Sequence, residues 1–280
     1  MEQIHLKIQK TLGPRAGLIE QVPFFILLLT FFLLPFFFIP SQGAPFLLTK
    51  STILYGGVLV AFILWVLLRL ADGKLNLPRN YTFLCFALVP LSTFIAFLFS
   101  PVKSVSFLGS GASIDSLMSI VVLSALLFLV PSSFKTKNAI FTGYAAVLLS
   151  FLVLGLFFII RSVSIMNGGT ALSFGIFGSL TENPLGKWND VGIFAGAILM
   201  LSMLTFYFLK PPALSRFFLT ALSVIALIVV SLVNFSVLWY ILGIFSLVFF
   251  VYTIILKRKE RSSSTAEGQM GEMSMGKKAS

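Results

Sequence analysis

The residues of this chain that could do chemistry gather in one polar run, Thr181–Asp190, and at Arg161 upstream of it. Carboxylate, ammonium and amide groups so close together can bind a charged head group through ion pairs and hydrogen bonds. An arginine adds a planar fork of donors, which suits a diphosphate better than lysine does. The candidate substrate-binding residues are therefore Arg161, Glu182, Lys187, Trp188, Asn189 and Asp190.

Four of these candidates have a second interpretation. Asn189 and Asp190 precede a long apolar stretch, where they would cap a helix and complement its positive dipole end. Trp188 suits the aromatic belt at a membrane surface. Arg161 can extend its charged head to lipid phosphate. The sequence alone leaves both interpretations open at each position.

Ser113 and Asp115, at the start of another apolar stretch, have the same two interpretations. Residues 101–115 and 161–190 would form one outer vestibule if both helix starts face it. Two positive helix ends would then converge on an anion such as phosphate.

The composition excludes ordinary soluble domains. Of the 280 residues, 58% are hydrophobic, 10% are charged and 32 are Phe, which leaves too few polar groups to cover a soluble fold. Cys85 is the single cysteine, so a disulfide framework is excluded. His5 is the single histidine, which argues against a zinc or similar site. We expect a membrane protein with no cofactor and no metal.

Eight apolar stretches are long enough to cross a bilayer as helices, which takes about 20 residues each. They are Val22–Ile39, Ser51–Leu70, Tyr81–Ser100, Ile114–Val130, Ala139–Ile160, Val191–Leu209, Phe217–Leu232 and Ser236–Leu256. The last two are separated only by Val233–Ser236, where we predict a tight hairpin. Gly192 and Gly196 predict close helix packing in the sixth stretch. The predicted fold class is an all-α, polytopic transmembrane bundle of about eight spans.

The basic residues predict the orientation of this bundle. If the N-terminus is cytoplasmic, only four of the 20 Lys and Arg residues fall in outer segments: Lys50, Lys103, Arg161 and Lys187. The positive-inside rule therefore predicts both termini in the cytoplasm, in a multi-pass protein of the inner (plasma) membrane. Membrane lipids are expected partners. Nucleic acid is not, despite the net charge of +11, because the bases are dispersed between spans.

The predicted organisation has three parts. Residues 1–20 form a cytoplasmic N-terminal segment, either a frayed tail or an amphipathic helix with Ile4, Ile8 and Leu12 on one face. Residues 21–257 form the transmembrane domain with its long outer loop 161–190. Residues 258–280 form a disordered, basic cytoplasmic tail.

Three segments resemble the N-terminal half of the O-antigen ligase/polymerase-like superfamily of bacterial envelopes. They are Phe107-Leu108-Gly109 with the Ser-rich residues after it, Gly178–Asp190 leading into Val191-Gly192-Ile193-Phe194, and the turn Asn234–Trp239. The resemblance extends over about residues 20–256. It implies handling of polyprenyl-diphosphate-linked glycans at the outer leaflet, with Arg161 and Lys187 facing the diphosphate.

Two departures bear on catalysis. The family commonly carries a Ser-Arg pair where this chain has Asn234-Phe235-Ser236, and its large catalytic outer loop, which includes a histidine, comes later than residue 280. Whether the chain is an enzyme therefore stays open, and a partner membrane subunit is one alternative.

The predicted function is a role in envelope polysaccharide assembly, as an O-antigen ligase-like protein that need not be catalytic alone. A lipid or small-molecule transporter or flippase and a structural membrane subunit are the alternatives. An ion-coupled pump is disfavoured, because no predicted span carries a charged residue near its midpoint.

Overall fold

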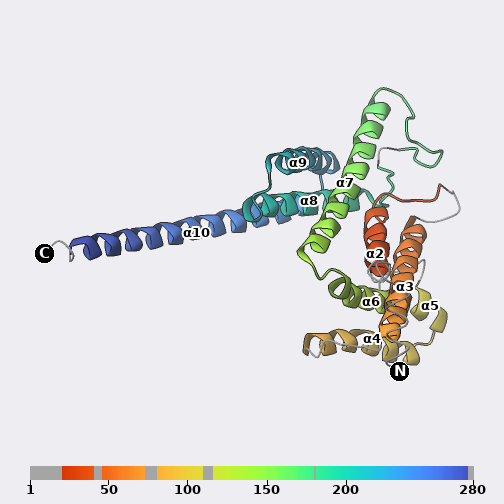
Figure 1. Ribbon diagram of the computed structural model, residues 1–280. Coiled ribbons are helices and arrows are strands. Elements are labelled where there is room, and N and C mark those ends of the chain that lie inside the picture. Colours follow the sequence, from red (N-terminus) through yellow and green to blue (C-terminus); the bar gives the residue numbers. More distant parts are fainter. Residues whose placement is uncertain (1–20, 41–45, 73–80, 110–115, 180, 277–280) are drawn as a thin grey trace, which may run out of the picture. The chain divides into compact units, whose positions relative to one another are not determined.

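The structure is a computed structural model that describes residues 21–40, 46–72, 81–109, 116–179 and 181–276. Within these ranges every regular element is an α-helix, apart from an isolated bridge between Asn183 and Gly186. Figure 1 shows the helices: α2 (Val22–Leu33), α3 (Phe46–Asp72), α4 (Tyr81–Phe99), α5 (Lys103–Leu108), α6 (Leu117–Ser133), α7 (Lys137–Met166), α8 (Trp188–Phe208), α9 (Ala213–Val233) and α10 (Ser236–Gly276). The all-α prediction is confirmed. The predictions for residues 1–20, Ser113 and Asp115 lie outside the described residues.

Each of the eight apolar stretches overlaps one helix, and α5 is the short additional one. Five helices are long and apolar enough to cross a membrane: Leu48–Ala71, Lys137–Met166, Trp188–Phe208, Ala213–Val233 and Ser236–Leu256. Three apolar helices are shorter: Val22–Leu33, Ala87–Phe99 and Leu117–Ser133. These helices indicate an integral, multi-pass membrane protein.

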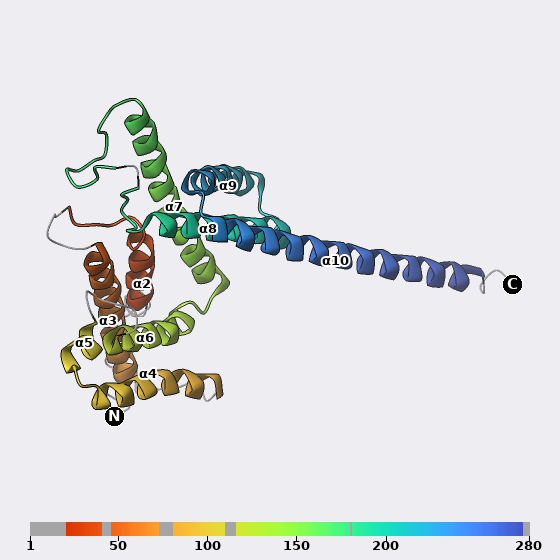
Figure 2. The same cartoon turned by 180° about the vertical axis from the view of Figure 1, so that it is seen from behind.

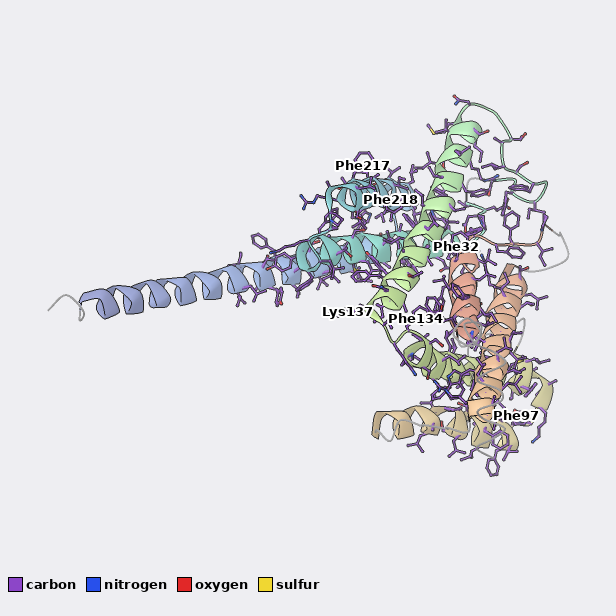
Figure 3. The ribbon with its side chains drawn as sticks, viewed as in Figure 1. Phe32, Phe97, Phe134, Lys137, Phe217 and Phe218 are labelled. Carbon is purple, nitrogen blue, oxygen red and sulfur yellow. The ribbon has the colours of Figure 1, made fainter. Side chains whose placement is uncertain are left out.

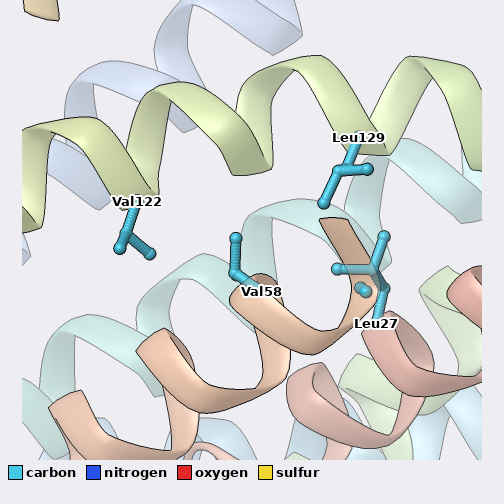
Figure 4. Packing of buried hydrophobic residues seen from close by; sticks show 5 residues of the cluster. Leu27, Val58, Val122 and Leu129 are labelled. Carbon is cyan, nitrogen blue, oxygen red and sulfur yellow. The ribbon is translucent and has the colours of Figure 1, made fainter. Parts of the chain in front are cut away.

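The chain divides into two compact units between Val191 and Gly192. In the first unit, α2 packs against α3 and α7, and α6 packs against α3 and α4. α2, α3 and α6 meet in one buried cluster, which is drawn in Figure 4: Leu27, Val58, Ala61, Val122 and Leu129. Close packing of this kind holds helices together in lipid, where burial of apolar surface adds little because the tails are equally apolar.

Residue contacts give the directions of these helices. The Tyr55 hydroxyl is hydrogen-bonded to the Ser119 hydroxyl, and further along both helices the Trp65 and Phe128 rings lie 4.8 Å apart. α3 and α6 therefore run in the same sense along their contact. Lys50, near the start of α3, bonds to the backbone just after α2, so these two helices are antiparallel.

α2 ends earlier than the predicted stretch, which continues to Ile39. Pro35 lacks an amide hydrogen and its ring clashes with the preceding turn, so the helix stops at Leu33. The side chain of Lys50 satisfies three backbone carbonyls beyond that point: its Nζ donates to the oxygens of Leu34 (2.6 Å), Pro35 (2.8 Å) and Phe37 (2.9 Å). An ammonium group has three donors and no acceptor, which fits this arrangement.

The second unit contains most of α8 together with α9 and α10. A Cβ atom on Gly192 would lie 2.8 Å from Cγ1 of Val233, and one on Gly196 would lie 2.6 Å from Cδ1 of Leu238. Further along, the rings of Tyr207 and Phe249 are 5.4 Å apart. α8 and α10 are therefore parallel and closely packed, as the two glycines predicted.

The predicted break between the last two apolar stretches is confirmed. α9 ends at Val233, and Asn234 adopts the left-handed conformation (φ 47°, ψ 47°) that often terminates a helix. The Asn234 side chain accepts a hydrogen bond from Nε1 of Trp239, at 3.3 Å. α10 begins at Ser236, so the link consists of two residues.

α10 differs from the sequence prediction at its far end. It continues as a helix to Gly276, through most of the tail that we predicted to be disordered from residue 258. The tail contains helix-favouring Lys, Arg, Glu and Met residues but is also rich in Ser and Gly, so helix propensity alone does not account for this extension.

Replacing Gly192 by Val should loosen the second unit. The new side chain would meet the stiff, β-branched Val233, and overpacking of this kind typically costs about 1–3 kcal/mol. Gly243→Val is the matched control, since a Cβ atom on Gly243 meets nothing within 4 Å. Thermal unfolding in detergent should show a lower Tm for Gly192→Val than for Gly243→Val, and equal Tm values would contradict the packing described.

Candidate functional site

The outer loop predicted from the sequence is the irregular segment between α7 and α8, and Arg161 lies beneath it. Arg161 belongs to the last turns of α7 and is 2% exposed. Its Nη2 donates to the backbone oxygen of Ser179 at 2.6 Å, and its guanidinium lies 5.2 Å from the centre of the Phe177 ring. The described contacts of Arg161 are thus with the loop that follows it.

One donor of this guanidinium is left over. Nε of Arg161 is buried and has no hydrogen-bond partner among the described residues. A buried donor without an acceptor costs roughly 1–3 kcal/mol. Arg161 therefore holds the loop with part of its bonding capacity unused.

Glu182 closes the loop on itself. Its Oε2 accepts hydrogen bonds from the backbone N–H of Ser179 (3.0 Å) and from that of Gly178. These two donors, with a smaller contribution from the positive charge of Arg161, hold the pKa of the Glu182 carboxyl below its ordinary value against a small opposing effect of burial. The carboxylate is exposed but already bonded, so it would meet a ligand through its remaining lone pairs.

Four phenylalanines fix the loop to the helices, and we call them the phenylalanine cluster: Phe38, Phe157, Phe174 and Phe177. Phe38 follows α2, and its ring centre lies 5.0 Å from that of Phe177. Phe157 belongs to α7 and lies 5.8 Å from Phe177. At the other end of α2, Phe24 lies 4.9 Å from Phe134, just before α7. α2 and α7 therefore run parallel, with the loop above their far ends.

The backbone of the loop is strained where it presents one of these rings. Leu172 (φ 58°) and Phe174 (φ 49°) both occupy the left-handed region, which bulky side chains rarely adopt. Phe174 is nevertheless 53% exposed. Strain of this kind persists only where the surroundings enforce it, and it often marks functional segments.

The remaining candidates lie where the loop enters α8. The helix begins at Trp188, so its N-cap position is Lys187, and Asn189 and Asp190 lie inside the first turn, two and three residues beyond the cap. Asp190 still complements the positive end of the helix. Lys187 and Asn189 are exposed, whereas Trp188 is half-buried, with its ring 5.4 Å from that of Phe158 on α7.

The structure therefore brings together only some of the candidates. Arg161 and Glu182 both bond to the backbone of the loop. Trp188 packs against Phe158, which lies three residues before Arg161 and so on the same face of α7. Among the residues described, the hydrogen bond and the ring contact of Arg161 go to Ser179 and Phe177, not to Lys187, Asn189 or Asp190.

The expected vestibule is not assembled from the part of residues 101–115 that is described. α5 packs against α4 and α6. Figures 1 and 2 agree that it lies well away from the segment between α7 and α8.

Sequence reasoning missed two residues that build the loop. Ser179 contributes its backbone oxygen to Arg161, and a backbone group leaves no trace in residue type. Asn183 is 1% exposed, and its Oδ1 accepts from the N–H groups of Leu185 and Gly186, both at 3.0 Å. The pair Asn183-Pro184 is a turn signal that could have predicted this role.

No group of three or more His, Cys, Asp or Glu side chains in the described ranges is placed to hold a metal ion. Comparisons with protein-family models, with curated proteins and with solved structures found no match.

Replacing Arg161 by Met should release the loop. The change removes a charge-assisted hydrogen bond to Ser179, which is worth about 1.5–3 kcal/mol. We expect trypsin to cleave after Lys187 at least tenfold faster in this variant. Arg216→Met, in the second unit, is the control and should leave that cleavage unchanged. Equal cleavage in both variants would mean that Arg161 does not hold the loop.

The loop should also loosen at acid pH through Glu182. Because folding lowers this pKa, the carboxylate contributes stability above its unfolded value of 4.5 and loses it as pH falls through the lower folded value. Hydrogen exchange of Gly178 and Ser179, corrected for the intrinsic rate, should accelerate below about pH 4.5. In Glu182→Gln this acceleration should be absent, and the same acid response in both proteins would contradict the assignment.

Proposed function

We propose that the chain is an eight-span inner-membrane protein of envelope glycan assembly that binds polyprenyl-diphosphate-linked sugars at its outer loop. Supporting this is the segment between α7 and α8, which is anchored on a buried arginine and presents an exposed lysine and an exposed aromatic ring. Lys187 would meet the phosphate groups, and Phe174 would lie against apolar prenyl carbons. Catalysis is not part of the proposal.

The proposed topology, with both termini in the cytoplasm, is supported by helix directions. Alternate crossing requires α3 and α6 to be parallel, α2 and α7 to be parallel, and α8 and α10 to be parallel. The contacts described above fit all three requirements. The distribution of basic residues supports the same side for both termini.

The shortness of α2 is compatible with a crossing. Twelve residues of helix reach only about 18 Å. The apolar residues after Leu33 can supply the remaining length in a more extended form. Non-helical backbone is tolerated at membrane depth only if its polar groups are bonded, and Lys50 bonds three of the carbonyls concerned.

Reporter fusions test the topology directly. A reporter active only in the cytoplasm should be active at both termini, and a cysteine placed at Asn189 should react with a membrane-impermeant thiol reagent added outside intact cells. A cytoplasmic Asn189, or termini on opposite sides, would contradict the eight-span arrangement.

Binding tests the function. Purified protein in nanodiscs should bind a polyprenyl-diphosphate-linked oligosaccharide, and Lys187→Ala should weaken that binding about fivefold or more through loss of a charged contact. Lys103→Ala is the matched control, because Lys103 is also exposed and also predicted on the outer side but belongs to α5. Binding that is absent, or equally affected by both changes, would count against the proposal.

A structural membrane subunit is the second candidate. It is favoured by the bonding of Arg161 and Glu182 within the loop itself. This candidate predicts no glycan binding in the wild-type protein and tolerance of changes at Lys187 and Asn189. The binding experiment therefore separates the two.

A further inference from the structure

A second polar site lies in the first unit, at the end of the helices away from the outer loop. A cavity of about 530 Å³ opens between the start of α2, the end of α3, the end of α6 and the start of α7. Phe24 and Trp65 contribute aromatic surface, and Thr142 lies on the α7 wall. None of the candidate residues of the outer loop lines this cavity.

The lining of the cavity is basic and rich in donors. Arg69 on α3 and Lys135, just before α7, are its charged residues, and no acidic side chain is among the described lining residues. Ser133 and Asn138 add hydroxyl and amide groups, whereas the hydroxyl of Ser132 already donates to the carbonyl of Phe128. Two cations beside several neutral donors form the usual environment of a bound phosphate group.

Trp65 lines the cavity beside Arg69. Its Nε1 is buried and has no acceptor among the described residues. The guanidinium of Arg69 lies 5.8 Å from the centre of the indole ring.

An apolar groove of about 480 Å³ adjoins this cavity between α2 and α7. One wall consists of Phe25, Leu28, Leu29 and Phe32, and the other consists of Thr142, Ala145, Ala146 and Leu149. Each set follows the i, i+3, i+4, i+7 spacing of one helix face. Thr142 lines both hollows, so the polar cavity leads into the groove.

We propose that the cavity and groove together bind an anionic glycerophospholipid. Its phosphate lies between Arg69 and Lys135, and one acyl chain follows the groove between α2 and α7. Charge complementarity selects an anionic head group, and the continuity of a basic cavity with an apolar groove selects an amphiphile over a soluble phosphate. Under the proposed topology these helix ends face the cytoplasm, where anionic lipids attract basic residues.

The test uses the full-length protein, stripped of lipid in detergent and titrated in a native mass spectrometer. The probes are phosphatidylglycerol and phosphatidylcholine with identical acyl chains. Wild type should retain one phosphatidylglycerol more tightly than phosphatidylcholine. Lys135→Ala should weaken phosphatidylglycerol binding about fivefold, as expected for one basic residue near a lipid phosphate. Ala145→Trp, which fills the exposed groove, should weaken both lipids.

Lys137→Ala is the matched control. Lys137 is exposed two residues after Lys135, at the start of α7 (Figure 3), but does not line the cavity. Equal affinity for the two lipids, or equal effects of Lys135→Ala and Lys137→Ala, would overturn the proposal. Displacement of phosphatidylglycerol by millimolar inorganic phosphate would overturn the lipid as occupant. The outer-loop variants do not enter this experiment, so its failure would leave the glycan-binding proposal standing.

Discussion

The constraint on which this structure depends is that a backbone carbonyl surrounded by lipid must have a hydrogen-bond donor. Helices meet it automatically, and the chain is helical almost throughout its apolar stretches. The place where a helix stops early shows what the constraint demands. Beyond Leu33 the carbonyls of Leu34, Pro35 and Phe37 would be left without donors, and the ammonium group of Lys50 reaches all three. The position of this charge among apolar residues is explained by the break in α2.

The hydroxyl groups of Ser and Thr are subject to the same constraint as donors, because they too need a hydrogen-bond partner where water is absent. Several Ser and Thr hydroxyls therefore donate back to carbonyls one turn earlier in their own helices: Ser124 to Ile120, Ser162 to Phe158 and Thr205 to Leu201. Ser119 instead bonds across to Tyr55. Such cross-helix bonds fix the register of neighbouring helices, because apolar packing alone is permissive of sliding.

Sequence reasoning predicted those features that follow from long-range composition. Each apolar stretch became a helix, the polar interruption at Asn234 became a break, and Gly192 marked a close contact. It failed where one residue acts on the backbone of another. The early end of α2 depends on Pro35, and the bonding of Arg161 depends on a carbonyl of Ser179. The cavity beside Arg69 requires four helix ends to meet, and no local pattern encodes that meeting.

The two ends of the first unit differ in how their basic side chains are placed. At one end a cation is buried and turned inward to organise the outer loop, whereas at the other end two cations line an open cavity. Arginine serves both purposes, because its donors suit a backbone carbonyl as well as an anion. The surroundings decide between these uses: Phe177 and the rest of the phenylalanine cluster cover Arg161, and Arg69 lies beside a hollow.

The two-residue link between α9 and α10 has a mechanical consequence. With Asn234 and Phe235 as the only connection, neither helix can change its depth without the other. Each contributes a predominantly apolar segment of 21 residues, about 32 Å of helix. A bilayer of different thickness must therefore be accommodated by tilting the pair as one rigid hairpin or by deforming the lipid around it. The hairpin therefore fits best in a membrane whose hydrocarbon thickness is close to the length of its two apolar helices.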